Sequence, residues 1–183
     1  LLDGKSLPLT RQTLTVSVKG QDGTLSQVER QVYASSFGPV VQWPGKLDWD
    51  NRHAYSLRDA NLDNTRVLQQ WYQINRADSL QALKASVALL QGIPWVNTLA
   101  VDEAGQALYL NQSVVPFVDQ DLLAQCSDPA LAGPAVVLNG SRSACQWKID
   151  PQAAQPGITP AHLLPSLERR GFVQNSNDPA WMG

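Results

Sequence analysis

Alternating apolar and polar positions divide the first third of the chain into strands. The alternation covers residues 14–19 and returns over residues 28–33, with the turn residues Gly-Gln-Asp-Gly at 20–23 between the two runs. A period of two on either side of a glycine-containing turn predicts a β-hairpin. Further short strands are expected at residues 38–43 and 54–58. This part of the chain therefore has the pattern of a β-rich lobe.

In the middle of the chain the spacing of apolar residues changes from two to three or four, which predicts two helices. The first carries Val67, Leu68, Trp71 and Ile74, and the second carries Leu80, Leu83, Val87 and Leu90. One of residues 63–65 is expected to cap the first helix, and Asp78 with Gln81 has the spacing of a capping box at the start of the second. Gly92 and Pro94 end the second helix, so the two should form a helical hairpin packed on a sheet.

A second β-hairpin is expected after the helices, because strand patterns at residues 95–101 and 106–110 flank the turn sequence Asp-Glu-Ala-Gly. Nearer the C-terminus, a short helix is expected to start at Thr159 and to kink or end at Pro165. A last strand should follow at residues 172–174.

Together these elements predict an α+β fold with antiparallel sheet. The expected segments are a β-rich lobe at 1–58, the helical hairpin at 59–94, a core β-hairpin at 95–118, a loop region at 119–158, and a short helix and strand at 159–183.

Composition restricts the classes of function. The 183 residues carry 14 Lys and Arg against 16 Asp and Glu, a net charge of −2. No basic surplus is available to release phosphate counterions, so nucleic acid is not an expected partner. No apolar run approaches the ~18 residues of a membrane-spanning helix, so no membrane insertion is expected. The sequence starts without Met and shows no signal-peptide pattern, which predicts a piece cut from a longer chain.

The two cysteines, Cys126 and Cys145, are 19 positions apart in a stretch rich in Pro, Gly, Ala and Ser. No Cys-x-x-Cys motif and no nearby histidine pair accompanies them, which argues against zinc. A disulfide across a loop region is favoured, and it would indicate an oxidising compartment such as the periplasm. Two unpaired thiols in a cytosolic protein remain the alternative.

Complete catalytic or cofactor motifs are missing from the sequence. His53 and His162 have no partners at metal-ligand spacing, so no metal site is expected. Neither a Gly-x-Ser-x-Gly elbow nor a glycine-rich phosphate loop is present, and no cofactor is expected. Most of the six tryptophans are expected in the core.

Four stretches, in their order and spacing, resemble a known family. They are Arg58-Asp59-Ala60-Asn61, the segments at 65–72 and 91–102, and Phe172-Val173-Gln174-Asn175-Ser176-Asn177-Asp178. This set resembles the β-subunit of the penicillin acylase family of N-terminal nucleophile hydrolases, over residues 3–181. The resemblance implies a segment of the family's four-layer αββα fold.

The family's chemistry implies one catalytic residue in this chain. Its members cut themselves to free a β-chain whose first residue, usually Ser, attacks an amide with its own α-amine as base. One oxyanion donor is the side-chain amide of an Asn in an Asn-x-Asn pattern, which here matches Asn177. An asparagine that only closes a turn is the alternative. The nucleophile, its His and the backbone oxyanion donor would lie upstream of Leu1, and a supporting Arg beyond Gly183.

The resemblance is strongest to the acyl-homoserine lactone acylases of this family. It implies that Trp71, Trp95 and Val96 line an apolar pocket for the acyl chain, against the alternative that they pack in the core. It also supports pairing of Cys126 with Cys145.

The implied function is hydrolysis of the fatty acyl amide of N-acyl-homoserine lactones, which quenches quorum signals, or of an acylated siderophore precursor. The implied location is the periplasm, and the implied partners are the α-subunit, the rest of the β-subunit and a small N-acyl substrate. The fragment alone is expected to be inactive. A penicillin or cephalosporin acylase and a noncatalytic periplasmic lipid-binding module are the alternatives.

Overall fold

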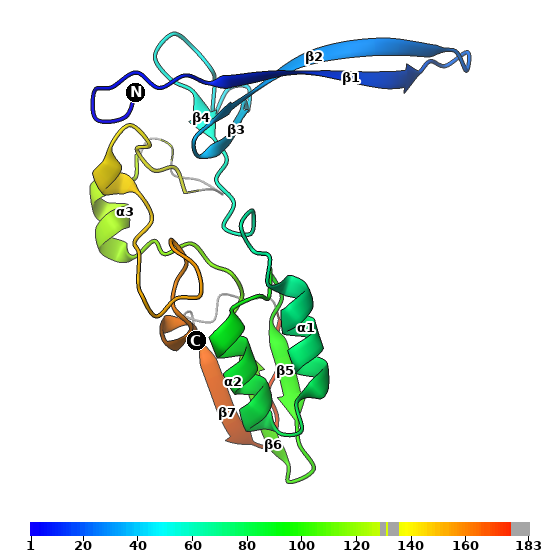
Figure 1. Ribbon diagram of the computed structural model, residues 1–183, viewed down its shortest axis with the longest axis vertical. Coiled ribbons are helices and arrows are strands. Elements are labelled where there is room, and N and C mark those ends of the chain that lie inside the picture. The colour runs from blue at the N-terminus through cyan, green and yellow to red at the C-terminus, as the bar shows by residue number, and fades with distance from the viewer. Residues whose placement is uncertain (129–130, 132–135, 177–183) are drawn as a thin grey trace. The chain divides into compact units, whose positions relative to one another are not determined.

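The computed structural model describes residues 1–128, 131 and 136–176, which fall into two compact units (Figure 1). Unit 1 holds Leu1–Asp59 together with Asp128–Ser143. Unit 2 holds Ala60–Ser127 and the chain from Ala144 onward. The chain therefore leaves unit 2 after Ser127 and re-enters it at Ala144.

Unit 1 is built on an antiparallel sheet in the order β1-β2-β3-β4. Its strands are β1 (Thr10–Lys19), β2 (Leu25–Ser35), β3 (Gly38–Val41) and β4 (Tyr55–Ser56). The predicted first hairpin is confirmed, and its strands are longer than the alternation alone indicated. At the turn, Asp22 Oδ1 accepts from the backbone N–H of Thr24 at 3.1 Å, and Gly23 takes a φ of +82°, which glycine tolerates best.

A second part of unit 1 is tied back to the N-terminus. The backbone N–H of Ser143 donates to Asp3 Oδ1 at 2.9 Å, and the N–H of Asp3 donates to the carbonyl of Ser141 at 2.8 Å. The hydrogen bond from Ser143 holds the pKa of Asp3 below its usual value. A Cβ on Gly140 would lie 3.3 Å from the Phe37 ring, so this loop packs closely against the turn between β2 and β3.

Unit 2 places a helical hairpin on an antiparallel sheet in the order β5-β6-β7 (Figure 1). The elements are α1 (Val67–Arg76), α2 (Leu80–Leu90), β5 (Thr98–Val101), β6 (Gln106–Leu110) and β7 (Ser166–Arg170). Its main core joins Leu80 and Val87 of α2 to Leu108 and Leu110 of β6 and to Ile93. The α+β class with a helical hairpin on antiparallel sheet is therefore confirmed.

Both helices start differently from the prediction. Arg66, not one of residues 63–65, is the N-cap of α1, and its side chain makes no cap hydrogen bond. In α2 the cap is Ser79, whose Oγ accepts from the N–H of Ala82 at 3.2 Å. The predicted capping box was wrong by one residue, because the hydroxyl of Ser79 takes the position assigned to Asp78.

The end of the described chain also differs from the prediction. In place of an α-helix from Thr159, the structure has a single 3₁₀ turn at Ala161–Leu163. The last strand is β7, five residues that pair along the whole length of β6, and the strand predicted at 172–174 is wrong. Residues 95–97 likewise lie outside β5.

The region between the hairpin and the last strand contains a helix that the sequence did not predict. Helix α3 (Gln120–Cys126) is capped by Asp119, which accepts from the N–H of Leu122 at 3.0 Å. Lys148 donates to the other oxygen of Asp119 and is the main reason that the pKa of Asp119 lies below its usual value. The last residue of α3, Cys126, forms a disulfide with Cys145, which leaves neither thiol free.

Candidate functional site

Trp71 lies on the outer side of α1. Its neighbour Gln70 is fully buried and Ile74 packs against the main core, so the inner side of the helix is formed by other residues. Trp71 keeps 41% of its surface exposed, and Leu68 and Tyr72, three positions before and one after, are more exposed still. The alternative that Trp71 packs in the core is not what this geometry shows.

Trp95 and Val96 lie in the connection between α2 and β5. Ile93 is buried in the main core, and two residues later Trp95 is 79% exposed, with Val96 at 38%. The prediction that most tryptophans are core residues was wrong among the described residues. Those that are exposed are Trp43, Trp49, Trp71 and Trp95.

A set of side-chain amides holds the backbone that carries Trp95. The N–H of Gly92 donates to Gln70 Oε1 at 3.1 Å, and Asn64 Nδ2 donates to the carbonyl of Gly92 at 3.0 Å. Asn61 Nδ2 donates to the carbonyl of Pro94 at 3.1 Å. Three hydrogen bonds therefore attach the segment before Trp95 to α1 and to the loop that precedes α1.

Arg66, the N-cap of α1, adds hydrogen bonds to the last carbonyls of α2. Its Nε donates to the carbonyl of Leu90 at 2.7 Å, and its guanidinium also donates to the carbonyl of Gln91 at 3.1 Å and to Gln155 Oε1 at 2.9 Å. A cation at the C-terminal carbonyls of a helix satisfies orphan acceptors and complements the helix dipole. Burial lowers the pKa of Arg66 from its usual value.

Gln91, at the end of α2, is a buried residue in a left-handed conformation, with φ +42° and ψ +46°. Such a conformation is unfavourable for a residue with a Cβ. Its side chain compensates, because Nε2 donates to the carbonyl of Thr159 at 2.8 Å and Oε1 accepts from the N–H of Ala154 at 3.0 Å. Gln91 thereby links the helical hairpin to the segment before β7.

Close packing at Gly92 leaves no room for a side chain. A Cβ there would lie 2.8 Å from Gln70 Cβ and 2.9 Å from the carbonyl oxygen of Arg66. We expect Gly92→Ala to destabilise the parent by about 1–3 kcal/mol through overpacking. Urea unfolding measures this change.

Gly105→Ala is the control for Gly92→Ala. A Cβ on Gly105 meets nothing within 4 Å, but the residue has a φ of +77°. Gly105→Ala should therefore lower the free energy of unfolding only by the conformational strain of a Cβ at positive φ, roughly 1 kcal/mol. An equal or smaller loss for Gly92→Ala than for Gly105→Ala would contradict the close packing at Gly92.

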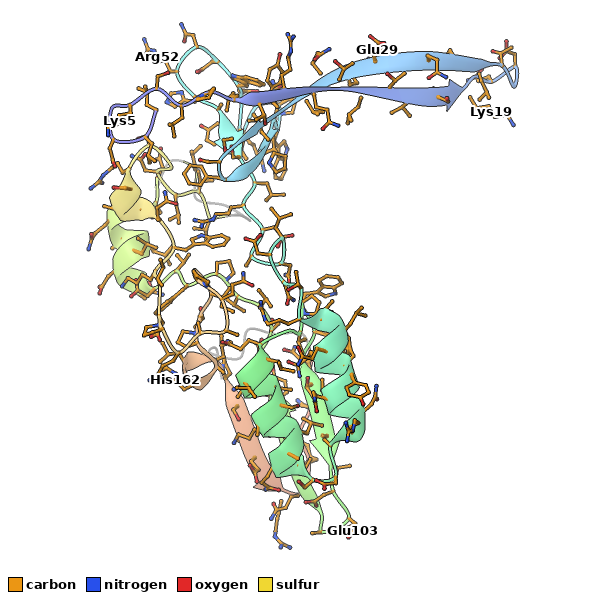
Figure 2. All side chains as sticks on the ribbon, viewed as in Figure 1. Lys5, Lys19, Glu29, Arg52, Glu103 and His162 are labelled. Atoms are coloured by element: carbon orange, nitrogen blue, oxygen red, sulfur yellow. A yellow bond between two sulfur atoms is a disulfide. The ribbon has the colours of Figure 1, made fainter. Side chains whose placement is uncertain are left out.

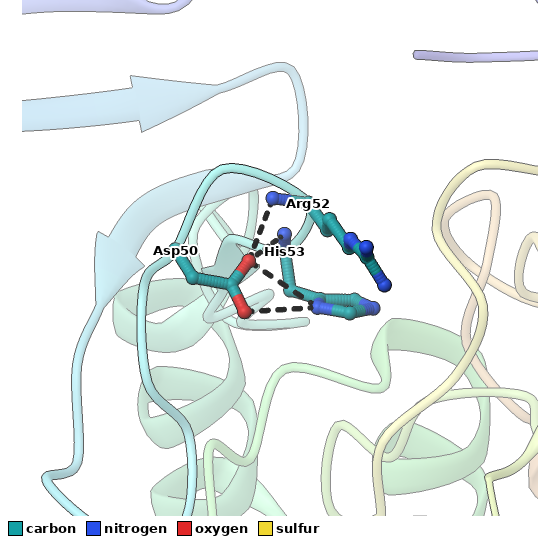
Figure 3. Close-up of polar contacts among 3 residues, drawn as sticks. All are labelled: Asp50, Arg52 and His53. Carbon is teal, nitrogen blue, oxygen red and sulfur yellow. Dashed lines mark hydrogen bonds and ion pairs between the residues drawn. The ribbon is translucent and has the colours of Figure 1, made fainter.

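His53 lies beside Asp50 in an exposed turn of unit 1. Asp50 Oδ1 accepts from the N–H groups of Arg52 at 2.6 Å and of His53 at 2.7 Å, and Nδ1 of His53 lies 3.3 Å from the same oxygen (Figure 3). These N–H groups, that of Arg52 first, lower the pKa of Asp50. The arrangement is a carboxylate closing an exposed turn. Figure 2 shows His162 on the 3₁₀ turn before β7.

Among residues 1–128, 131 and 136–176, no cluster of three metal-ligating side chains occurs. Within the same part of the chain, no helix has both the length and the apolar content that a membrane crossing requires.

Asn177, assigned to the oxyanion by resemblance, lies outside the described residues. Of the other predicted residues, the structure brings Trp95 and Val96 to the surface of unit 2 and connects their segment to α1, the helix of Trp71. Sequence reasoning missed the amides and the arginine that make this connection. The signal that could have found them is the repeated Asn, Arg and Gln within residues 58–72.

Comparison with known proteins decides the family. The profile described as penicillin amidase matches residues 1–182. The chain belongs to the penicillin amidase family. This membership agrees with the resemblance read from the four sequence stretches.

Relatives within the penicillin amidase family extend well beyond this chain. It is 77% identical over 182 residues to the acyl-homoserine lactone acylase PvdQ of Pseudomonas putida, a match that covers 100% of this chain and 24% of that protein. It is 39% identical over 187 residues to the aculeacin-A acylase of Actinoplanes utahensis, covering 99% of this chain and 23% of that protein. The chain therefore spans about a quarter of the length of these relatives.

A solved structure agrees with the fold. The thermostable penicillin G acylase from Alcaligenes faecalis matches with a TM-score of 0.62 at 18% identity, over 94% of this chain and 27% of that one. At this identity the match concerns the fold alone. It supports an α+β fold like that of part of this penicillin G acylase.

Proposed function

We propose that the chain is part of an acyl-homoserine lactone acylase, an amide hydrolase that removes the fatty acyl chain from N-acyl-homoserine lactones. The observation that carries this proposal is the 77% identity to such an acylase over essentially the whole chain. An acylated siderophore precursor is a second substrate of the same chemistry, because it presents the same fatty amide to the nucleophile.

In the proposed mechanism this chain supplies binding and one hydrogen-bond donor. An N-terminal Ser outside the chain attacks the amide carbonyl, its α-amine accepts the proton, and water later releases the fatty acid. Asn177 donates its side-chain N–H to the oxyanion that develops on the carbonyl. The 183 residues alone, without the nucleophile, should hydrolyse no amide.

Trp71, Trp95 and Val96 form the proposed wall for the acyl chain. Their exposure in this chain leaves them available for contact, and an apolar chain gains roughly 0.8 kcal/mol for each methylene that the wall buries. The hydrogen bonds at Gly92 and Pro94 support this role, because they fix the backbone on which Trp95 stands. A fixed wall favours one chain length over another.

The periplasm is the proposed location, with the parent made as a self-cleaving precursor. The disulfide between Cys126 and Cys145 supports it, since such bonds persist in oxidising compartments and are rare in the cytosol.

The direct test is an assay of the purified, full-length parent. Lactones with acyl chains of four to fourteen carbons and penicillin G are offered separately, and the free amine and the released acid are both quantified. The proposal expects equal amounts of the two products from long-chain lactones, and none after replacement of the N-terminal nucleophile by alanine. Turnover of penicillin G alone would indicate a penicillin-type acylase. Lactone binding without release of acid would indicate a lipid-binding module.

Trp95→Ala should change chain-length selectivity in the parent. We expect kcat/KM to fall about tenfold for a twelve-carbon lactone, which corresponds to ~1.4 kcal/mol. For a four-carbon lactone it should fall less than about twofold, because only the long chain reaches the wall. Leu89→Ala is the matched control, since Leu89 on α2 is 78% exposed and is not assigned to the wall. An unchanged ratio of the two rates in Trp95→Ala would remove Trp95 from the pocket.

A further inference from the structure

The hairpin of β1 and β2 has two chemically different faces. Residues directly opposite each other in an antiparallel pair point to the same side, and successive residues alternate between sides. In the observed register, Val16 lies opposite Val28, and its neighbour Thr15 lies opposite Glu29. The odd positions of β1 therefore belong to one face and the even positions to the other.

The polar face satisfies its own hydrogen bonds. Thr13 and Gln31 are cross-strand partners, and Gln31 Nε2 donates to Thr13 Oγ1 at 2.9 Å. Gln27 Nε2 donates in the same way to Ser17 Oγ at 2.8 Å. These two cross-strand pairs satisfy each other, and Figure 2 shows Glu29 and Lys19, on the same face, extending from the ribbon.

The other face is mainly apolar, and the described residues of unit 1 do not cover it to the extent expected of a core. We call it the apolar face, and its aliphatic members are Leu14, Val16, Val18, Val28 and Val32. Val16 is 53% exposed, and Leu14, Val18 and Val32 are 38% to 44% exposed. Thr10, Gln12, Ser26, Arg30 and Ala34 occupy the remaining positions on this side.

An isolated hairpin of this kind is marginal in water. Two strands without a third, or without packing on one face, rarely hold their pairing, and β2 meets β3 only at Ala34 and Ser35. An alternation with one apolar side is typical of antiparallel strands whose apolar side is packed. The length of these strands and their alternation therefore predict that further structure packs on the apolar face.

We propose that the apolar face packs against the remainder of the parent polypeptide, the part outside residues 1–183. The relatives are about four times as long as this chain, so the parent has ample further structure to supply an apolar counterpart. Arg30 fits such an interface, because its guanidinium already donates to the carbonyl of Glu29 at 2.8 Å and its stem is apolar. The inference requires only that the parent is longer, and it does not depend on the substrate.

Cysteine accessibility in the purified parent tests this proposal. Val16→Cys places a thiol on the apolar face, and Thr15→Cys places one on the polar face of the same strand. We expect a maleimide to label Val16→Cys at least tenfold more slowly than Thr15→Cys under native conditions, and both at the same rate in urea. The unsubstituted parent gives the background from its own cysteines, and Val18→Cys with Ser17→Cys is a second pair should the first fail to fold.

The outcomes separate the possible covers. Equal labelling of the two native variants overturns the proposal, because the apolar face would then be open to solvent. The protein is also diluted through any dimer–monomer transition, which light scattering detects. Loss of the protection of Val16→Cys on this dilution also overturns the proposal, because a second copy of the protein would then be what packs on the apolar face. Protection that persists in the monomer supports the proposal, and since labelling needs no turnover, the result is independent of the acylase assay.

Discussion

Asn177→Ala in the full-length parent is expected to lower kcat for a long-chain lactone by roughly 10²–10³-fold, which corresponds to about 3–4 kcal/mol of lost transition-state stabilisation. In the proposed mechanism the side-chain amide donates to an oxygen that carries charge only once the nucleophile has added, so its loss should act on kcat and leave KM within about threefold. Steady-state kinetics with lactone of one chain length separates the two parameters.

Two further variants make the Asn177 test specific. Ser176→Ala removes a hydroxyl from the neighbouring exposed residue and should keep kcat within about twofold. Asn177→Asp keeps the shape but replaces the donor by a carboxylate, so it should be no more active than Asn177→Ala. A kcat for Asn177→Ala close to that of the unsubstituted parent would mean that Asn177 only closes a turn, even if the acylase assay itself succeeds.

Local sequence pattern was enough to predict the hairpins and the helical pair. Residues 14–19 and 28–33 alternate with a period of two, and the structure pairs them in β1 and β2. The turn before β6 shows the same agreement, because the N–H of Gln106 donates to Asp102 Oδ1 and Gly105 takes a positive φ. In these places the residues that determine the conformation are close in sequence.

Elements formed by distant contacts were missed. The strand β7 has the sequence Ser-Leu-Glu-Arg-Arg, and all five of its residues are exposed. It is a strand because its backbone pairs with β6, from Leu110 opposite Ser166 to Gln106 opposite Arg170. Helix α3 is only seven residues long, too short for a helical period to stand out from a region rich in small residues. Pairing with β6 determines the strand β7, and the cap by Asp119 determines where α3 begins.

The site residues were named from resemblance and stay a prediction, whereas the contacts that hold their segment in place were not predicted. Trp71 and Trp95 were named from resemblance, while composition favoured the core for most tryptophans; the structure leaves both exposed. Large exposed aromatic residues are unfavourable on the solvent-exposed surface of a complete protein. Their exposure here therefore points to ligand binding or to contact with other parts of the parent protein. The partly buried Arg66 and the amides that hold the segment before Trp95 could not be found from local pattern, because Arg66 and Gln155 meet across 89 positions of sequence.

The disulfide variant Cys126→Ala/Cys145→Ala is expected to lose about 3 kcal/mol of unfolding free energy, since the bond closes a loop with a sequence separation of 19. The bond lies where the chain leaves unit 2 after Ser127 and returns at Ala144, so it fixes both ends of that excursion. Both sulfurs belong to buried residues, and Cys126 also ends α3. Urea unfolding of the parent should show a lower midpoint with little change in slope, and hydrogen exchange should rise first in α3. Reduction of the unsubstituted parent should reproduce the same shift, which separates the lost bond from the changed side chains. Equal midpoints for the oxidised and reduced parent would show that the Cys126–Cys145 bond adds nothing to stability and that the packing of α3 suffices.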